Sequence, residues 1–347
     1  MPLKQPGHAR SSFLVSDLGK GTVVVTGGAG LIGSAIIWGL NSRNLENVWL
    51  VDWVEPGSLK ARNTAPLSYS RHLTPDDFRK MVRESSPELS DISTLFHLGA
   101  CSSTTETNEE YLNDNNVRYT RELCEWSLNN NVRFVYASSA STYGDGSLGM
   151  DDEDEDLQKF NPLNLYGWSK HKFDLIAQEN NWLDHIVGLK YFNVYGPNEE
   201  HKGNMRSVVS KAYEQIASSG EMTLFTSHNP DYQDGEQMRD FLYVKDSVLM
   251  TIWLAEASHT QGLFNLGNGK ARTWLDLGRA IFSALGKEEN IRFVEMPKTL
   301  RDKYQYFTEA KIEKLRRAGY TNELFDLEDA VRDYVTQYLV PDQRLGS

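Results

Sequence analysis

The sequence contains only two cysteines, Cys101 and Cys124, among its 347 residues. Two cysteines are too few for a disulfide framework or a zinc site, so we expect no metal and two buried thiols in a reducing compartment. The sequence also lacks an apolar run of about 18 residues, which a membrane-spanning helix would need. Its first residues are polar and lack the apolar segment of a secretory signal peptide. We therefore expect a cytoplasmic protein with a loose tail at 1–21 and no membrane partner.

Positive charge is in the minority: 36 lysines and arginines stand against 48 aspartates and glutamates, which gives a net charge of -12 and a pI near 5.2. A surface that binds nucleic acid or an anionic membrane would need a basic face, so neither partner is expected. An anionic small molecule would instead need a few local cations. With 39% hydrophobic residues, the chain can bury a large core in one large or two intimate domains.

A strand, a glycine turn and a helix follow one another from Thr22. TVVVT is a short β-branched run, GGAGLIG comes directly after it, and SAIIWGLNSR then suits a helix. Gly27, Gly30 and Gly33 would let the backbone turn tightly and approach a pyrophosphate, while the helix N-terminus offers free amides. The next strand, VWLVD, ends at Asp52, where a carboxylate can accept the ribose hydroxyls of an adenosine. These features predict a dinucleotide site.

The alternation of strands and helices continues along the chain. A buried strand at 93–100 is followed by an amphipathic segment at 109–128 and then by the strand RFVYASS. Ser138, Ser139 and Ser141 come at the carboxyl end of that strand, where open α/β sheets bind ligands. The pattern predicts an α/β fold built on a Rossmann-type, doubly wound parallel sheet.

Tyr166 and Lys170 lie four residues apart in LYGWSKHKF, which we predict to be a helix, so both side chains would share one face. A tyrosine that takes up a proton at neutral pH must lose about three pKa units, and a neighbouring lysine supplies part of that shift. Because the chain has 16 tyrosines, one such spacing is expected by chance. The spacing therefore indicates a catalytic pair only if the rest of the chain forms a nicotinamide site and a substrate site around it.

After this helix the regular alternation ends. HIVGLKYFNVYGP reads as one buried strand that breaks at Gly196 and Pro197, and SHNPDYQDGEQM is a polar loop without periodicity. RDFLYVKD, the helix at 246–257 and GLFNLGNG are expected to return to the main sheet, and later elements would build a second lobe. We predict a tail at 1–21, a cofactor domain at 22–192 plus about 240–266, and a smaller α/β substrate-binding lobe at 193–239 plus about 267–340.

Several strings in this order resemble the extended short-chain dehydrogenase/reductase family: TGGAGLIG, the acid Asp52, YASSASTYG, the pair Tyr166 and Lys170, and KYFNVYGP. Within that family the chain is similar to the ADP-L-glycero-D-manno-heptose 6-epimerases, and the similarity extends from residue 22 to about 335. It is carried by GACSSTTE, NDNN, LNLYGWSK, YFNVYGPNEEHKGNM, RDFLYV, GLFNLGNG and YQYFTEAKIEKLRRAGY.

The resemblance implies an isomerase that inverts C6″ of ADP-D-glycero-β-D-manno-heptose for the lipopolysaccharide inner core. The cofactor would take a hydride from the carbinol carbon, leave a transient 6″-ketone and return the hydride to the opposite face. The resemblance also implies a homo-oligomer and tightly bound NADP or NAD, with NADP favoured. Trp53 stands where the family has a small polar residue, and Lys60, in a predicted loop with Arg62, only approximates its 2′-phosphate lysine, so the choice stays open.

The resemblance further implies roles for individual residues. Lys202, in the string HKG, would be a second base opposite Tyr166, since one tyrosine does not obviously serve both faces of the ketone. Ser139, with Ser141 as the alternative, would hydrogen-bond the reacting oxygen, and Lys170 would anchor the nicotinamide ribose. The implied cofactor-binding positions are Gly27, Gly30, Leu31, Ile32, Gly33, Asp52, Lys60, Gly99, Ala100, Cys101, Ser102, Asn115, Lys170 and Val194. The implied substrate-binding positions are Asn193, Asn204, Lys211, Phe225, Arg239 and Tyr304.

Two other interpretations are open. A 4-epimerase or 4,6-dehydratase for another nucleotide sugar would share the fold. However, a dehydratase needs an Asp-Glu pair where this chain has Ser141 and Thr142, and a 4-epimerase has no HKG lysine. A non-catalytic dinucleotide-sensing protein would bind the cofactor without turning over a nucleotide sugar. Such proteins often lose the tyrosine or the lysine, whereas this chain keeps Tyr166 and Lys170.

Overall fold

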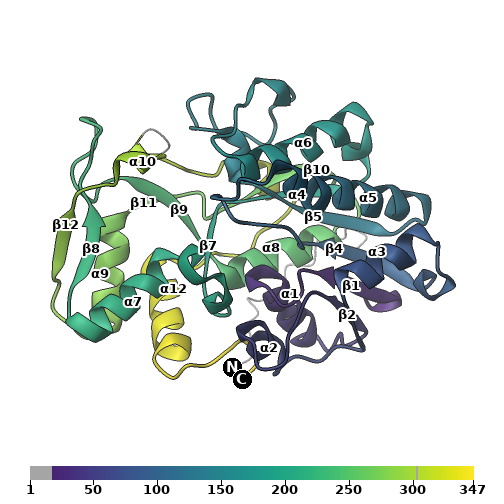
Figure 1. Cartoon of the computed structure of the whole chain (residues 1–347), viewed down its shortest axis with the longest axis horizontal. Helices are drawn as coiled ribbons and strands as arrows, with labels where there is room; N and C mark the ends of the chain where they lie inside the picture. The colour runs from purple at the N-terminus through teal and green to yellow at the C-terminus, as the bar shows by residue number, and fades with distance from the viewer. Residues whose placement is uncertain (1–17, 302–303) are drawn as a thin grey trace.

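The computed structural model describes residues 18–301 and 304–347, and its centre is a sheet of seven parallel strands (Figure 1). The order β10-β6-β5-β4-β1-β2-β3 means that the chain starts inside the sheet, winds to one edge and then to the other. This is the predicted doubly wound, Rossmann-type arrangement. The strands are β1 (Thr22–Thr26), β2 (Val48–Val51), β3 (Arg71–Leu73), β4 (Ile92–His97), β5 (Arg133–Ser139), β6 (Val187–Tyr191) and β10 (Gly262–Leu266).

Alternate residues of β1 belong to two separate apolar cores, because their side chains point to opposite faces of the sheet. Val23 and Val25 pack in the core beneath two helices, and Val24 packs in the core beneath three others. Both faces of the sheet are therefore buried, which explains the unbroken β-branched run in the sequence. The two helices are α1 (Leu31–Asn41) and α8 (Val244–Glu256), and the three are α3 (Pro75–Arg83), α5 (Tyr119–Asn129) and α6 (Leu165–Glu179). No helix in the described ranges is long and apolar enough to cross a membrane.

Shorter elements complete this part of the molecule. Lys60 and Arg62, predicted in a loop, instead lie on a short helix, because Ser58 caps it by accepting a hydrogen bond from the Ala61 amide at 3.1 Å. Residues 1–17 of the predicted tail lie outside the described residues, whereas Leu18 is buried in a short 3-10 helix. The elements are η1 (Leu18–Lys20), α2 (Leu59–Thr64), η2 (Pro87–Leu89), α4 (Glu109–Leu112), the π-helical turn η3 (Asn113–Arg118), η4 (Ala140–Tyr143), η5 (Leu157–Lys159) and η6 (Trp182–Asp184).

A smaller set of strands and helices lies beside the main sheet, at the left of Figure 1. It contains a three-stranded sheet in the order β11-β9-β7 and a separate parallel pair, β12 and β8. The strands are β7 (Asn193–Tyr195), β8 (Met222–Phe225), β9 (Met238–Tyr243), β11 (Ala271–Thr273) and β12 (Ile291–Val294). The helices are η7 (Glu200–Met205), α7 (Val208–Ser219), α9 (Trp274–Ala284), α10 (Lys298–Arg301), α11 (Glu313–Arg317), α12 (Leu327–Tyr334) and η8 (Val335–Leu339).

The predicted single strand at 185–197 is wrong, because the chain leaves the main sheet between β6 and β7. Phe192 donates its amide to the Leu266 carbonyl at 2.9 Å, and Asn193 then pairs with Phe241 in the smaller sheet. The segment RDFLYV, which forms most of β9, therefore does not return to the main sheet as predicted. The apolar character is continuous across the crossing, so hydrophobicity alone gave no sign of where the partner strand changes.

Candidate active site

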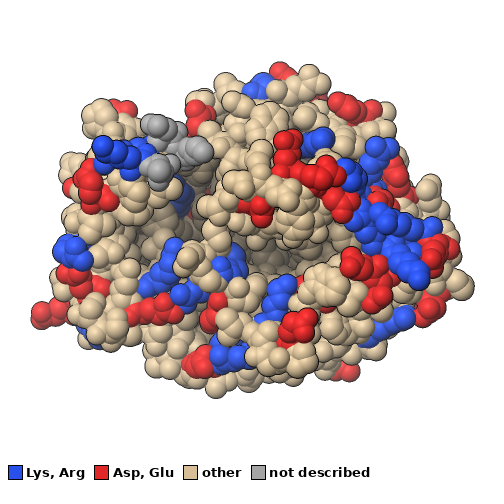
Figure 2. All heavy atoms as spheres, viewed as in Figure 1, with Lys and Arg blue, Asp and Glu red and all other residues tan. Residues whose placement is uncertain are grey.

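A cavity of about 730 Å³ opens at the carboxyl ends of the parallel strands and receives side chains from both sets of elements. Figure 2 shows the hollow near the middle of the face that it displays, with basic side chains beside it. Lys60, Lys202 and Arg206 are among the lining residues, so an acidic protein concentrates cations here. Among the described residues no cluster of His, Cys, Asp and Glu could hold a metal ion.

The glycine turn after β1 forms one wall of the cavity and has the shape that a dinucleotide needs. Gly27 has a φ of +68°, and a Cβ added to Gly33 would lie 2.1 Å from the Gly27 carbonyl oxygen, which no side chain could tolerate. The N-cap of α1 is Gly30, which has no side chain to occupy the first amides of the helix. These amides and the positive end of the helix dipole fit a pyrophosphate group.

Asp52, at the end of β2, is held in place from three directions. Its Oδ2 accepts a hydrogen bond from the Ala29 amide at 3.0 Å, and its Oδ1 accepts from the Trp53 amide and from Lys60 Nζ, each at 2.7 Å. The carboxylate therefore ties the glycine turn to α2. An adenosine ribose placed here would meet a carboxylate and an ammonium together, rather than the carboxylate alone.

The segment Gly99–Ser102, which follows β4, forms the opposite wall. Its conformation is fixed by Asn116, whose Oδ1 accepts from the Cys101 amide at 2.8 Å and whose Nδ2 donates to the Cys101 carbonyl at 3.0 Å. Asn116 also donates to Ser169 Oγ on α6 at 2.9 Å. Asn115, which we predicted to bind the cofactor, donates to Asn116 Oδ1 at 3.1 Å and is not among the lining residues. Its assignment to the cofactor stays a prediction.

Cys101 corrects the expectation of two buried thiols. It is half-buried and lines the cavity, whereas Cys124 is fully buried in the core. Burial raises the pKa of the Cys124 thiol because a thiolate is poorly solvated there.

Tyr166 and Lys170 line the cavity from α6, which Asn164 caps by accepting a hydrogen bond from the Gly167 amide at 2.8 Å. Burial lowers the pKa of Lys170 to about 8, although the charge of Asp174 opposes this shift. Lys170 Nζ donates to the Ala137 carbonyl at 2.8 Å, so an ammonium still has hydrogens to offer a ligand.

The pKa of Tyr166 is shifted in the opposite direction from the one we expected. Burial raises it, the thiol of Cys101 adds to this effect, and a hydrogen bond from Ser139 opposes it. The predicted lowering by Lys170 is therefore absent in the protein alone. Since oxidised nicotinamide is cationic, its ring is the further positive charge that could stabilise a tyrosinate here.

Ser139, rather than Ser141, faces the cavity at the end of β5. Ser139 is among the lining residues, and its Oγ accepts from the Ser141 amide at 3.1 Å and from Ser141 Oγ at 2.8 Å. Ser141 thus stands behind Ser139 and orients its hydroxyl. The arrangement leaves the Ser139 hydrogen available for Tyr166 or a ligand oxygen.

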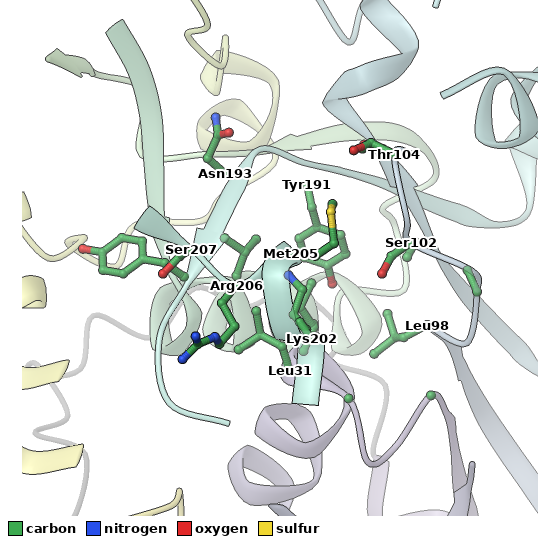
Figure 3. A pocket seen from close by; sticks show the side chains of 18 of the residues that line it. Leu31, Leu98, Ser102, Thr104, Tyr191, Asn193, Lys202, Met205, Arg206 and Ser207 are labelled. Carbon is green, nitrogen blue, oxygen red and sulfur yellow. The ribbon is translucent and has the colours of Figure 1, made fainter. Parts of the chain in front are cut away.

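Lys202 enters the cavity from η7, far from Tyr166 in the sequence. In Figure 3 it extends between Leu31 and Met205, with Ser102 across the cavity. Burial and the nearby Lys211 lower the pKa of Lys202, and Glu199 opposes the shift. A lowered pKa makes the neutral amine, which can accept a proton, more accessible.

The residues predicted for the substrate are spread over a wider region than the cavity. Asn193 lines it and donates to the Asp240 carbonyl at 3.2 Å, and Val194 lines it as well. Asn204 is exposed, and Lys211 and Phe225 are half-buried; none of these three is among the lining residues.

Arg239 lies behind the wall of the cavity, between two aromatic rings. Its Cζ is 5.6 Å from the Trp274 ring centroid and 5.2 Å from that of Tyr304, and Trp274 itself lines the cavity. The guanidinium is buried and donates to the carbonyl groups of Met238 and Gln305. Burial lowers the pKa of Arg239. Carbonyl groups and aromatic faces stabilise this buried cation without neutralising its charge, so it is suited to an anionic ligand.

The sequence interpretation missed three lining residues with clear roles in the architecture. Trp274 donates its Nε1 hydrogen to Tyr304 at 2.9 Å, and His201 contacts Asn63 at 3.3 Å beside the glycine turn. Met205 forms an apolar wall next to Lys202. His201 and Met205 flank Lys202 in the sequence, whereas no sequence signal distinguished Trp274 from the other tryptophans.

Comparison with known proteins agrees with this geometry. The chain matches the NAD dependent epimerase/dehydratase family over residues 23–267, and it belongs to this family. It is 50% identical over 316 residues to the ADP-L-glycero-D-manno-heptose-6-epimerase of Nitratidesulfovibrio vulgaris (strain DP4), which covers 91% of this chain and 97% of that protein. The resemblance inferred from the motifs is confirmed.

Solved structures give the same result for the fold. The crystal structure of Helicobacter pylori ADP-L-glycero-D-manno-heptose-6-epimerase has a TM-score of 0.75 at 27% identity and covers 92% of this chain and 96% of its own. A UDP-glucose 4-epimerase of Thermus thermophilus, in complex with NAD, has a TM-score of 0.70 at 25% identity, with coverage of 90% and 97%. The predicted fold and the predicted class, an NAD-dependent epimerase, are confirmed at the level of the family.

Proposed function

We propose that this chain inverts C6″ of ADP-D-glycero-β-D-manno-heptose to give the L-glycero epimer, through a transient 6″-ketone, for the lipopolysaccharide inner core. The proposal rests on the 50% identity to a 6-epimerase and, above all, on one observation of the structure: Lys202 and Tyr166 line the same cavity. Inversion by oxidation and reduction needs proton transfer on both sides of one carbon, and the cavity offers a candidate base for each.

Each candidate residue has a definite task at the reacting oxygen. A nicotinamide held in this cavity would supply the chemistry of hydride acceptance and return. The Tyr166 oxygen would take the hydroxyl proton from one epimer, and Lys202 Nζ would take it from the other. Ser139 would hold the reacting oxygen, and Lys170 would bind the ribose with the hydrogens that Ala137 leaves free. The lowered pKa of Lys202 supports its part, because only the neutral amine accepts a proton.

We propose NADP as the preferred cofactor, tightly bound because no net oxidation occurs. Lys60 is one-third exposed beside Asp52, so its ammonium can turn toward a 2′-phosphate while remaining close to the carboxylate. With NAD, the same lysine would stay paired with Asp52 and the ribose hydroxyls would compete for that carboxylate. Trp53, half exposed next to Asp52, borders this position.

The substrate residues and the domain division also remain proposals. We propose that Arg239, stacked on Tyr304, and the half-buried Lys211 bind the anionic nucleotide sugar, with Asn193, Asn204 and Phe225 beside them. We further propose a cofactor domain at 22–192 plus about 240–266 and a substrate-binding lobe at 193–239 plus about 267–340. We also propose that the protein is cytoplasmic and forms a homo-oligomer.

The direct test is to incubate the protein and NADP with ADP-D-glycero-β-D-manno-heptose and to follow the configuration at C6″ by NMR. We expect conversion to a mixture of both epimers with no net change in cofactor absorbance. UDP-hexoses serve as the comparison: turnover of a UDP-hexose in place of the heptose would indicate a 4-epimerase or dehydratase. Bound cofactor with no turnover of any nucleotide sugar would indicate a dinucleotide sensor.

A further inference from the structure

Residues 340–347, which we call the clasp, cross from α12 and η8 back to the cofactor side of the molecule. In Figure 1 this yellow segment runs to α2. The Leu345 side chain is fully buried in the same apolar core as Leu67. Asp342 forms an ion pair with Arg62 of α2 at 2.6 Å. The clasp is therefore packed in place and links the two sides of the cavity.

The clasp also contacts the loop that carries Lys202. The Leu345 amide donates to Asn198 Oδ1 at 3.2 Å. Arg344 Nε lies 3.6 Å from Glu200 Oε2, an ion pair that is too long for a hydrogen bond, and Arg344 Nη1 donates to Asp342 Oδ1 within the clasp at 3.1 Å. The Arg344 side chain is 5% exposed, and a charged side chain this deeply buried is costly without such partners, so its attraction to Glu200 links the clasp to the loop. Both contacts with the loop fall within the four residues that precede Lys202.

Asn198 joins the clasp to two other elements at once. Its Nδ2 donates to Ser34 Oγ on α1 at 3.0 Å, and its carbonyl accepts from Asn63 Nδ2 on α2 at 3.0 Å. Its remaining side-chain oxygen accepts from the clasp. Since Asn198 is fully buried, loss of any one partner would leave a buried polar atom unsatisfied. The start of the loop is thus fixed to the helix that follows the glycine turn.

On the far side of Lys202 the loop is exposed at two residues and then anchored again. Gly203 has a φ of +53°, a Cβ there would meet no atom within 4 Å, and Gly203 and Asn204 are exposed. Beyond these two residues, Arg206 forms an ion pair with Glu214 of α7 and donates from Nε to the Gly203 carbonyl at 3.0 Å, and the Ser207 hydroxyl donates to Glu199 at 2.6 Å. The direction of Lys202 therefore depends on contacts on both sides of it, and those that precede it include the contacts with the clasp.

We propose that Arg344 and Leu345 are positioning residues that hold Lys202 in the cavity. This inference rests on the proposed function, because it assigns them to the second base. Neither residue lines the cavity, so each acts through the loop. Loss of the ion pair between Arg344 and Glu200 would let the loop shift and Lys202 move with it. A displacement of about 1 Å at a reacting group can lower the reaction rate about a hundredfold.

The test separates the two bases by using the two epimers as alternative starting materials. The full chain, loaded with oxidised NADP, is mixed rapidly with either ADP-D-glycero- or ADP-L-glycero-β-D-manno-heptose, and the formation of reduced nicotinamide is followed by absorbance. Lys202→Met identifies the epimer that depends on Lys202. Arg344→Met is expected to slow reduction by that same epimer about tenfold or more, to change reduction by the other epimer by less than about twofold, and to be rescued in part by Arg344→Lys.

Controls keep the outcomes distinct. Arg332→Met removes an exposed arginine of α12 that pairs with Asp329, and it should change neither rate. If Arg344→Met does not fold, Glu200→Gln removes the same ion pair from its more exposed side and should give the same single-epimer defect. Equal slowing with both epimers, or no slowing, would overturn the inference. Failure of the unsubstituted protein to interconvert the two epimers, followed by NMR, would instead refute the proposed function.

Discussion

Lys202 Nζ and the phenol of Tyr166 reach one cavity from two parts of the fold. Lys202 comes from a loop beside the smaller sheet, and Tyr166 comes from a helix that packs on the main sheet. Tyr166 belongs to α6, whose start is fixed by the cap at Asn164. Lys202 belongs to η7, whose start is fixed by Asn198 and the clasp. Two fixed positions for the proposed bases would allow the same ketone to be approached from two directions, which the proposed inversion of a single centre requires.

The glycine turn gives a prediction about cofactor binding. Gly33→Ala would place a methyl group 2.1 Å from the Gly27 carbonyl, so the turn and α1 must separate. We expect NADP affinity, measured by fluorescence titration, to fall by about a hundredfold or more, together with a loss of a few kcal/mol of unfolding free energy. Gly57→Ala is the control, because a Cβ there meets no atom within 4 Å, although Gly57 has a positive φ that Gly33 lacks. A similar loss of NADP affinity in both variants would mean that the close approach at Gly33 does not explain the effect.

The pair formed by Lys60 and Asp52 gives a prediction about cofactor choice. Lys60→Ala removes the ammonium that we assign to the 2′-phosphate, and a hydrogen bond to a charged group contributes about 1.5–3 kcal/mol. NADP affinity should therefore fall by about tenfold or more, while NAD affinity should stay the same or rise because Asp52 becomes free for the ribose. Titration of both dinucleotides against both proteins measures this. An equal loss for NAD and NADP would rule out a role for Lys60 at the 2′ position.

The fold was predictable because its signals are local. The β-branched run of β1, the glycine turn and the serines after β5 each report on the residues beside them, and the parallel sheet follows from their alternation. The break between β6 and β7 was not predictable, because Phe192 and Asn193 continue an apolar run and only the choice of hydrogen-bond partner changes there.

The site was predictable to the extent that motifs carry it. Tyr166, Lys170, Ser139 and Lys202 all line the cavity as expected, although their roles stay predictions. The contact of Asn116 with Cys101 was not predicted, because the sequence does not show the π-helical turn that directs this side chain. The electrostatic prediction for Tyr166 was wrong in the protein alone, because the effect of burial on its pKa exceeded that of its neighbours.

His97 gives a prediction about pH-dependent stability. It is fully buried between Thr26 Oγ1 at 2.7 Å and Thr120 Oγ1 at 3.0 Å, and burial, with the charge of Lys170, lowers its pKa from 6.5 to about 3. Between these two values the unfolded chain binds one more proton than the folded chain, so this contribution is present above pH 6.5 and is lost as the pH falls toward 3. The loss is up to roughly 1.4 kcal/mol per pH unit.

The measurement is urea unfolding at pH 7 and at pH 5 for the unsubstituted protein and for His97→Asn. The stability difference between the two proteins should shrink at the lower pH, because the variant has no imidazole to protonate on unfolding. The exposed His185→Asn is the matched control and should leave the pH dependence unchanged. A difference that stays constant between pH 7 and pH 5 would contradict this account of His97.

The central claim is that two different bases serve the two faces of one carbon. Tyr166→Phe and Lys202→Met should each reduce epimerisation by about 10²–10⁴-fold, since each removes a proton-transfer group, and each should retain bound cofactor. The most direct measurement is the rate of cofactor reduction by each epimer in each variant. The account predicts a crossed pattern, in which Tyr166→Phe fails with one epimer and Lys202→Met fails with the other. Near-normal reduction by both epimers in Lys202→Met, with both lost in Tyr166→Phe, would contradict it.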